Sequence, residues 1–309
     1  MPLLSQTCAR SGWRAAAKMV GPIAARALRP GARGRVRAVF ERCFYVELDS
    51  GWVCVGGAGL GAGPLNLNWG WLNWGWSAAP SLPALPRSGE VARIDGTTLT
   101  AGPVAIALAG AEPWVAERVG AWDQASLARG LAAAHTALTR LAPRDGLALL
   151  GPADSCQRRA LLAAARAPLA HLAELLGGEP RGQPIDAARL APLIGLGPGL
   201  TPSGDDYLGG LLVALSLVGR RGLRDRLWQA VRPLTIERTT AISRVHLAAA
   251  AEGLGSAALH AALAAILSGA SDRMAAACAG LAGVGHSSGW DSLAGALSLL
   301  GAAEHRAGS

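Results

Sequence analysis

The chain has 309 residues, of which 51% are hydrophobic, so it can bury a large core and is long enough for one or two domains. Eight Arg or Lys residues precede the first acidic residue, Glu41, and removing these 8 from the 29 basic residues leaves 21 against 21 acidic ones. The net charge of +8 therefore belongs to the N-terminal segment, and the neutral remainder argues against nucleic-acid binding.

The five cysteines are scattered and include no Cys-x-x-Cys pair, so we expect free thiols rather than a disulfide framework or a zinc site. No apolar run reaches the roughly 18 residues that a membrane span needs. The composition predicts a soluble, cytoplasmic protein that has no membrane partner.

Residues 1–33 form a basic leader without acidic residues, which we expect to be helical or disordered. The composition resembles an organellar targeting peptide, but it also fits an ordinary first helix or a translation start upstream of a true start at Met19. The ordinary alternatives are favoured because the apolar core of a secretory signal is missing.

Residues 34–112 contain short runs rich in β-branched and aromatic residues, separated by glycine turns, with a hairpin signal at Asp95-Gly96. The runs are 36–40, 44–48, 52–55, 90–94, 97–100 and 104–108. This pattern predicts a small N-terminal antiparallel β domain.

A tandem Asn-Trp-Gly-Trp repeat occupies residues 68–76, just before the proline-rich linker 80–86. Its four indoles could form a stacking platform for a ring or an arginine. A local duplication in an exposed loop is the favoured alternative, because no titratable residue accompanies the tryptophans.

Residues 113–305 have apolar residues three and four apart, which predicts an all-helical domain interrupted by glycine-rich loops. The predicted helical segments are 127–141, 158–176, 205–218, 223–253, 256–268, 271–281 and 290–301. Together the two domains place the chain in the α+β class.

Two glycine units, 195–206 and 280–291, share five residues at an offset of 85, and three more matches follow at 208/293, 210/295 and 212/297. Each unit predicts a loop that ends in a serine cap, Ser203 or Ser288, and opens a helix. Helix N-termini carry free N–H groups and attract anions, so two of them suggest a site for small, doubly anionic molecules.

Asp205 and Asp206 fall in the first turn of the first predicted helix, and the spacing from Ser203 to Asp206 is that of a capping box. Capping explains one carboxylate, whereas the other could hold Mg²⁺ or orient a substrate amide. In the second unit, His286 could donate a hydrogen bond to an anion or act as a general acid, and a structural role is the alternative.

Between the two units, Thr239, Ser243 and His246 lie on one predicted helical face. Arg244 stands one position away and could meet a carboxylate or phosphate with two parallel hydrogen bonds. The alternative is that the hydroxyls bond to their own helix and that Arg244 is solvated.

The candidate catalytic residues are therefore Asp205, Asp206, Arg244 and His286, with Asp205 or Asp206 as the metal ligand if a metal is bound. The candidate substrate-binding residues are Gly197, Gly199, Thr201, Ser203, Gly204, Thr239, Ser243, Ser287, Ser288, Gly289 and Asp291. The chain has no nucleophile elbow, zinc-protease motif, P-loop or dinucleotide fingerprint. Catalysis would therefore depend on positioning and on electrostatic stabilisation.

The segments 195–206 (GLGPGLTPSGDD), 239–253 (TTAISRVHLAAAAEG) and 285–291 (GHSSGWD) together resemble a bacterial family long catalogued as a domain of unknown function, now associated with the AllH-type subunit of oxamate carbamoyltransferase. Weaker similarity extends to 36–40 and 63–66. The resemblance implies a role in allantoin degradation, a branch of purine catabolism. There, partner subunits would help to convert oxalurate and phosphate to oxamate and carbamoyl phosphate.

Two other functions stay open. The chain could be a non-catalytic subunit that binds an anionic metabolite or scaffolds its partners. It could also be a stand-alone Mg²⁺-dependent enzyme that acts on a small phosphorylated compound.

Overall fold

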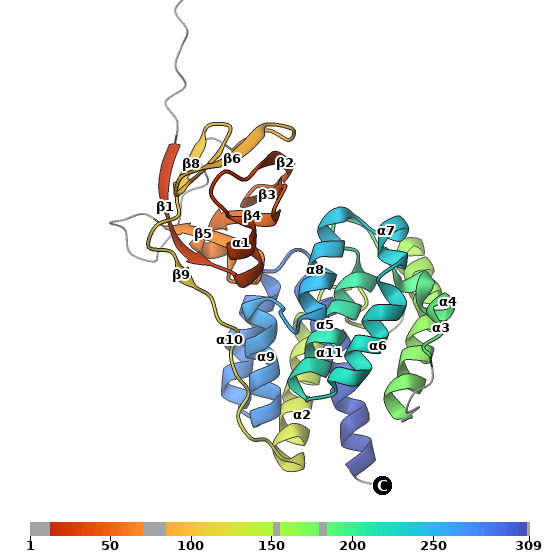
Figure 1. Cartoon of the computed structure of the whole chain (residues 1–309). Helices are drawn as coiled ribbons and strands as arrows, with labels where there is room; N and C mark the ends of the chain where they lie inside the picture. The colour runs from red at the N-terminus through yellow and green to blue at the C-terminus, as the bar shows by residue number, and fades with distance from the viewer. Residues whose placement is uncertain (1–12, 71–84, 151–154, 179–183, 308–309) are drawn as a thin grey trace, which may run out of the picture. The chain divides into compact units, whose positions relative to one another are not determined.

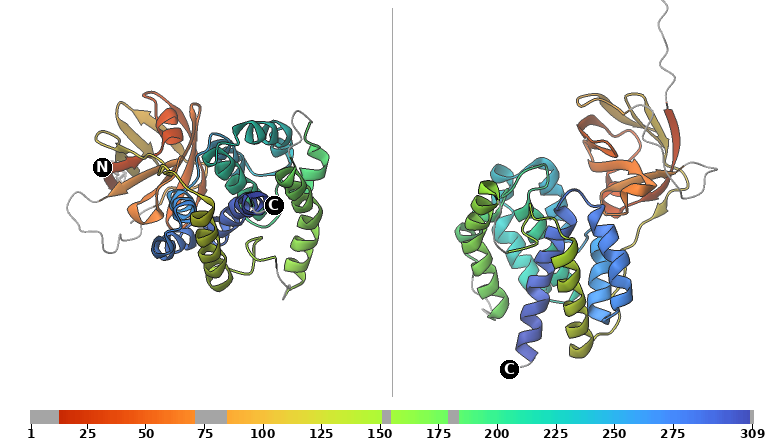
Figure 2. Two further views of the ribbon diagram at one scale, coloured as in Figure 1. Left: turned by 90° about the horizontal axis from the view of Figure 1, so that it is seen from below. Right: turned by 180° about the vertical axis from the view of Figure 1, so that it is seen from behind.

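The computed structural model describes residues 13–70, 85–150, 155–178 and 184–307. The chain forms two compact units, Met1–Val115 and Ala116–Ser309, which Figures 1 and 2 show from three sides. Each unit has its own hydrophobic core and is described separately.

The N-terminal unit is a β-barrel closed by a mixed sheet. Its elements are β1 (Trp13–Val20), α1 (Pro22–Ala27), β2 (Arg33–Val39), β3 (Cys43–Leu48), β4 (Gly51–Gly57), β5 (Asn66–Gly70), β6 (Val91–Asp95), β7 (Thr98–Ala101), β8 (Val104–Ala107) and β9 (Glu112–Pro113). The strands follow the order β5-β4-β3-β2-β6-β7-β8-β1, and β1 pairs again with β5 to close the ring, while β9 pairs with β1. Closure leaves the eight ring strands without a free edge.

The prediction of a small antiparallel β domain was wrong. Two pairings within the ring are parallel, β1 with β8 and β4 with β5. The closing strand β1 lies in the basic segment that was expected to be helical or disordered. Its sequence, WRAAAKMV, has no clear alternation, and pairing with both β5 and β8 determines its conformation instead.

The part of the tryptophan repeat that the structure describes belongs to the barrel. Trp69 on β5 is buried and packs edge-on against Trp13 on β1, with the ring centroids 5.3 Å apart. The other tryptophans of the repeat, at positions 71, 74 and 76, lie outside the described residues.

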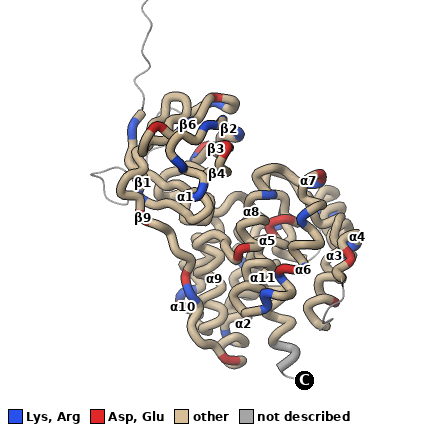
Figure 3. Tube along the Cα trace, viewed as in Figure 1, with Lys and Arg blue, Asp and Glu red and all other residues tan. Residues whose placement is uncertain are grey.

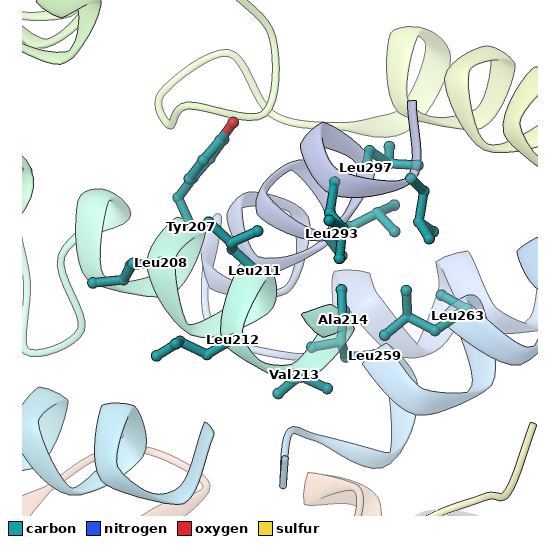
Figure 4. Close-up of a cluster of buried hydrophobic side chains, with 14 of the residues drawn as sticks. Tyr207, Leu208, Leu211, Leu212, Val213, Ala214, Leu259, Leu263, Leu293 and Leu297 are labelled. Atoms are coloured by element: carbon teal, nitrogen blue, oxygen red, sulfur yellow. The ribbon is translucent and has the colours of Figure 1, made fainter. Parts of the chain in front are cut away.

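The second unit is helical. Its helices are α2 (Gln124–Leu141), α3 (Cys156–Gly177), α4 (Ala187–Leu190), α5 (Ser203–Leu217), α6 (Arg221–Val231), α7 (Leu234–Arg238), α8 (Ala241–Ala251), α9 (Ala257–Ser268), α10 (Ser271–Ala282) and α11 (Ser288–Ala307). Helix α5 is apolar on nearly every side because it lies inside the unit. Figure 4 shows Leu211 and Ala214 of α5 beside Leu293 of α11 and Leu259 of α9.

Helices α5 and α11 pack at two glycines that occupy equivalent positions in the two sequence units. A Cβ on Gly210 would lie 1.7 Å from the carbonyl oxygen of Ser292, and one on Gly295 would lie 1.8 Å from that of Tyr207. Both contacts obey the offset of 85, since Ser292 corresponds to Tyr207. The helices that follow the two glycine loops, α5 and α11, therefore pack as reciprocal halves. Glycine is required at both contacts.

Acidic and basic residues are interspersed along the helical unit (Figure 3). The cysteines within the described residues, Cys43, Cys54, Cys156 and Cys278, are free. Of the helices in the described ranges, α3 alone has the length and apolar composition to cross a membrane. This is weak evidence for a membrane span, because core helices pass the same test.

Candidate functional site

Asp205 joins the first glycine loop to the start of α8. Its Oδ1 accepts a hydrogen bond from the backbone N–H of Gly195 at 2.9 Å. Its Oδ2 accepts from the hydroxyls of Ser243, at 2.6 Å, and Thr239. Asp205, Thr239 and Ser243 are therefore brought together as predicted, but they bind one another.

The two glycine units meet directly. The hydroxyls of Thr201 and Ser288 lie 2.9 Å apart. The Ser288 hydroxyl also faces the carboxyl of Asp206, and in the reciprocal arrangement the Ser203 hydroxyl faces Asp291. We name this cluster, made of Thr201, Ser203, Asp206, Ser288 and Asp291, the crossed-helix site.

The expected serine caps are wrong. Helix α5 begins at Ser203 after the N-cap residue Pro202, which makes no side-chain cap, and α11 begins at Ser288. The backbone N–H of Asp206 donates to the carbonyl of Pro202, and that of Asp291 donates to the carbonyl of Ser287. The residue before each serine is thus the helix boundary, which leaves the serine side chains to face the other half.

Two of the predicted backbone donors are occupied. The N–H of Gly204 donates to the carbonyl of Leu196 at 2.9 Å, and that of Gly289 donates to Val284 at 3.1 Å. A Cβ on Gly204 would lie 2.0 Å from the carbonyl oxygen of Leu193, so this glycine allows the loop to pack. The N–H groups of Ser203 and Ser288 have no acceptor within the described part of the chain.

The other two glycines of the predicted site shape the loop. Gly197 has a φ of 113° and Gly199 a φ of 93°, a region that disfavours residues with a side chain. These glycines let the loop turn back so that Thr201 reaches α11.

Asp206 is the carboxyl most strongly perturbed toward its neutral form. It lies deep in the unit, although the residue keeps some accessible surface, and its Oδ2 is buried without a hydrogen-bond partner in the described structure. Burial raises its pKa well above the usual range, the Ser288 hydroxyl opposes this rise, and the charge of Asp291 adds to it.

Asp291 is fully buried. Its Oδ1 accepts from the backbone N–H groups of Leu147 at 2.6 Å and Ala148 at 3.0 Å. Burial raises the pKa of Asp291, and these two donors, together with the nearby hydroxyls of Ser203 and Ser287, oppose the rise. Burial also raises the pKa of Asp205, against its three donors.

The three basic side chains near the predicted site, one arginine and two histidines, differ in their surroundings. Arg244 is half-buried in α8, and its side chain makes no hydrogen bond or ion pair with any described residue. Burial lowers the pKa of His246 to about 4, so this imidazole is neutral at pH 7. His286 is exposed, and its Nε2 lies 2.8 Å from the carboxylate of Asp145, which is also exposed.

Two further features near the site, the segment 146–149 and the buried Arg158 of α3, were not predicted from the sequence. Arg158 donates to the carbonyls of Gly146, at 3.3 Å, and Leu149. A Cβ on Gly146 would lie 2.3 Å from one Asp291 carboxylate oxygen, which makes glycine necessary there. The Asp-Gly at 145–146, just after Pro143, was a turn signal, but nothing in the sequence linked that turn to Asp291.

Within the described residues, no group of three or more His, Cys, Asp or Glu side chains is arranged to hold a metal ion. Asp205 has both oxygens engaged, as described above. Asp206 is the other predicted metal ligand, and the neighbouring carboxylate whose charge raises its pKa most is that of Asp291.

Comparison with known proteins gives one match. The model of a family described as oxamate carbamoyltransferase subunit AllH matches residues 193–300, about a third of the chain. No curated protein and no solved structure matches. The matched segment contains the first glycine loop, the start of α8 and the second glycine loop. Over these residues the chain is similar to the family described as oxamate carbamoyltransferase subunit AllH.

Proposed function

We propose that this chain is a subunit of an oxamate carbamoyltransferase-like complex, and that its crossed-helix site binds small anionic substrates for carbamoyl transfer. The substrates are oxalurate or oxamate, and carbamoyl phosphate or phosphate. One observation carries the proposal. The Thr201–Ser288 contact joins two helix N-termini whose first N–H groups are unpaired, within the segment that matches the family model.

Each open group has a role in the phosphorolysis of oxalurate. Arg244, which has no partner in the described structure, binds a carboxylate or phosphate of the substrate. The N–H groups of Ser203 and Ser288 donate to the ureido carbonyl oxygen as negative charge develops on it. These groups orient the substrate and stabilise charge.

Asp206 supplies the proton. A phosphate oxygen attacks the carbamoyl carbon and the bond from that carbon to the oxamate nitrogen breaks, so the leaving nitrogen needs a proton. Because burial keeps the pKa of Asp206 high, its carboxyl holds a proton that it can donate. The proton that the attacking hydrogen phosphate loses then returns to Asp206, which balances the cycle.

The partner subunits complete the complex, and the reaction belongs to allantoin degradation in the cytoplasm. A purely metabolite-binding subunit would use the same open groups without chemistry. In that case the isolated chain would bind oxamate or carbamoyl phosphate, and its variants would alter binding while the partners retained turnover.

The test is the rate of oxalurate phosphorolysis by the chain assembled with its candidate partner subunits. Asp206→Asn should lower the rate by removing the proton donor, and Arg244→Ala should lower it by weakening substrate binding. The matched control is Arg166→Ala, because Arg166 is an exposed arginine of α3. Wild-type rates in both site variants would refute the proposal.

A further inference from the structure

Arg158 is a buried cation that the proposed chemistry does not use. Its side chain is 4% exposed, and it forms no ion pair with a carboxylate of the described residues. Its guanidinium donates instead to the carbonyl oxygens of Gly146 and Leu149. A buried charge is costly unless its hydrogen bonds are satisfied, so these carbonyls have to be held in place.

The same segment binds a buried anion on its other side. The N–H groups of Leu147 and Ala148 donate to Oδ1 of Asp291, and Gly146 leaves the space that the carboxylate fills. The segment 146–149 therefore separates Arg158 from Asp291, with carbonyls directed at the cation and amides directed at the anion.

This arrangement couples the two charges. Carbonyls that bind a cation orient their peptide dipoles, and the amide ends then face the carboxylate, so each interaction strengthens the other. Asp291 also faces the Ser203 and Ser287 hydroxyls, and the carboxyl of Asp206 on α5 lies close enough to interact with its charge. The orientation of Asp291 therefore bears on the site that we propose binds substrate.

We propose that Arg158 is a positioning residue of the crossed-helix site: through the segment 146–149 it holds the carboxylate of Asp291 beside Ser203. Its importance for substrate binding rests on the proposed function, whereas the arrangement itself can be tested without a substrate.

The first experiment is hydrogen–deuterium exchange of the full chain. Arg158→Met removes the donors but keeps an aliphatic side chain, and it should speed exchange of the Leu147 and Ala148 amides by about tenfold or more, as expected for the loss of a hydrogen bond to a charged group. Arg158→Lys should restore part of the protection. Arg224→Lys is the control, since Arg224 binds Ser216 and Asp225 instead. Unchanged exchange at 146–149 in Arg158→Met would overturn the proposal.

The second experiment measures oxamate binding by calorimetry in a double-mutant cycle. If Arg158 acts through Asp291, Arg158→Met weakens binding in the wild-type background and adds nothing to Asp291→Asn. Equal losses in both backgrounds would refute the coupling. If Arg158→Met does not fold, Arg158→Lys replaces it in both experiments. Failure of the wild-type chain to bind oxamate would count against the proposed function, while the exchange experiment would still decide the role of Arg158.

Discussion

Substitution of Gly210 by alanine tests the helix crossing on which the site is built. The new Cβ would lie 1.7 Å from the carbonyl oxygen of Ser292, whereas real Cβ contacts essentially never fall below 3.0 Å. The backbones of α5 and α11 must therefore separate by about 1.3 Å, which is the difference between these two distances. A main-chain carbonyl in a helix cannot rotate away as a flexible side chain can.

The neighbouring glycine provides the control. A Cβ on Gly209 would meet only Ala250 and Leu247, at 3.8 and 3.9 Å, which is ordinary van der Waals contact. Both substitutions gain the same helix propensity of up to about 1 kcal/mol, so their difference isolates the packing cost. Overpacking costs about 1–3 kcal/mol, and we expect Gly210→Ala to be less stable than Gly209→Ala by an amount near the upper end of this range.

The assay is urea unfolding at equilibrium, followed by circular dichroism, with stabilities from linear extrapolation. Gly295→Ala should behave like Gly210→Ala because it is the reciprocal contact. If Gly210→Ala proves as stable as Gly209→Ala, the two helices do not pack as described, and the derivation of the site from their crossing is wrong.

Three further predictions concern the site residues. Because the pKa of Asp206 is raised, the folded chain keeps a proton that the unfolded chain loses above about pH 4. The free energy of unfolding should therefore fall as the pH rises from about 4 toward the pKa of the folded state. Urea titrations at a series of pH values should show a smaller fall for Asp206→Asn than for the wild type. Ser243→Ala removes a 2.6 Å hydrogen bond to buried Asp205 and should lower the free energy of unfolding by about 1.5–3 kcal/mol. The control Ser268→Ala should lower it less, because Ser268 is exposed and its hydroxyl bonds within its own helix. Equal losses would contradict this prediction. His286→Ala should keep the wild-type rate of phosphorolysis, because His286 lies exposed against Asp145, and a large loss would restore it as a catalytic candidate.

Local sequence features predicted the helical unit and the residues that meet in the site. The 85-residue repeat identified both glycine units, which meet in the structure through the hydroxyls of Thr201 and Ser288. The role of each serine side chain could not be predicted from the repeat, because capping depends on which residue begins the helix. Pro202 takes the N-cap position in α5, and Ser203 turns to the other half.

Features set by long-range contacts could not be predicted. Strand β1 has an alanine-rich sequence, and only pairing with β5 and β8 defines it as the strand that closes the barrel. Arg158 resembled any helical arginine, and the segment 146–149 resembled a turn after Pro143. Their link to Asp291 spans more than 130 residues of sequence and exists only in the folded unit.

If the two glycine units and Arg244 form one anion site, a crystal structure of the full chain soaked with oxamate or phosphate will reveal it. We expect an anion within hydrogen-bond distance of the Arg244 guanidinium and of the N–H of Ser203 or Ser288. An anion bound elsewhere, with these groups left unoccupied at saturating concentration, would contradict it.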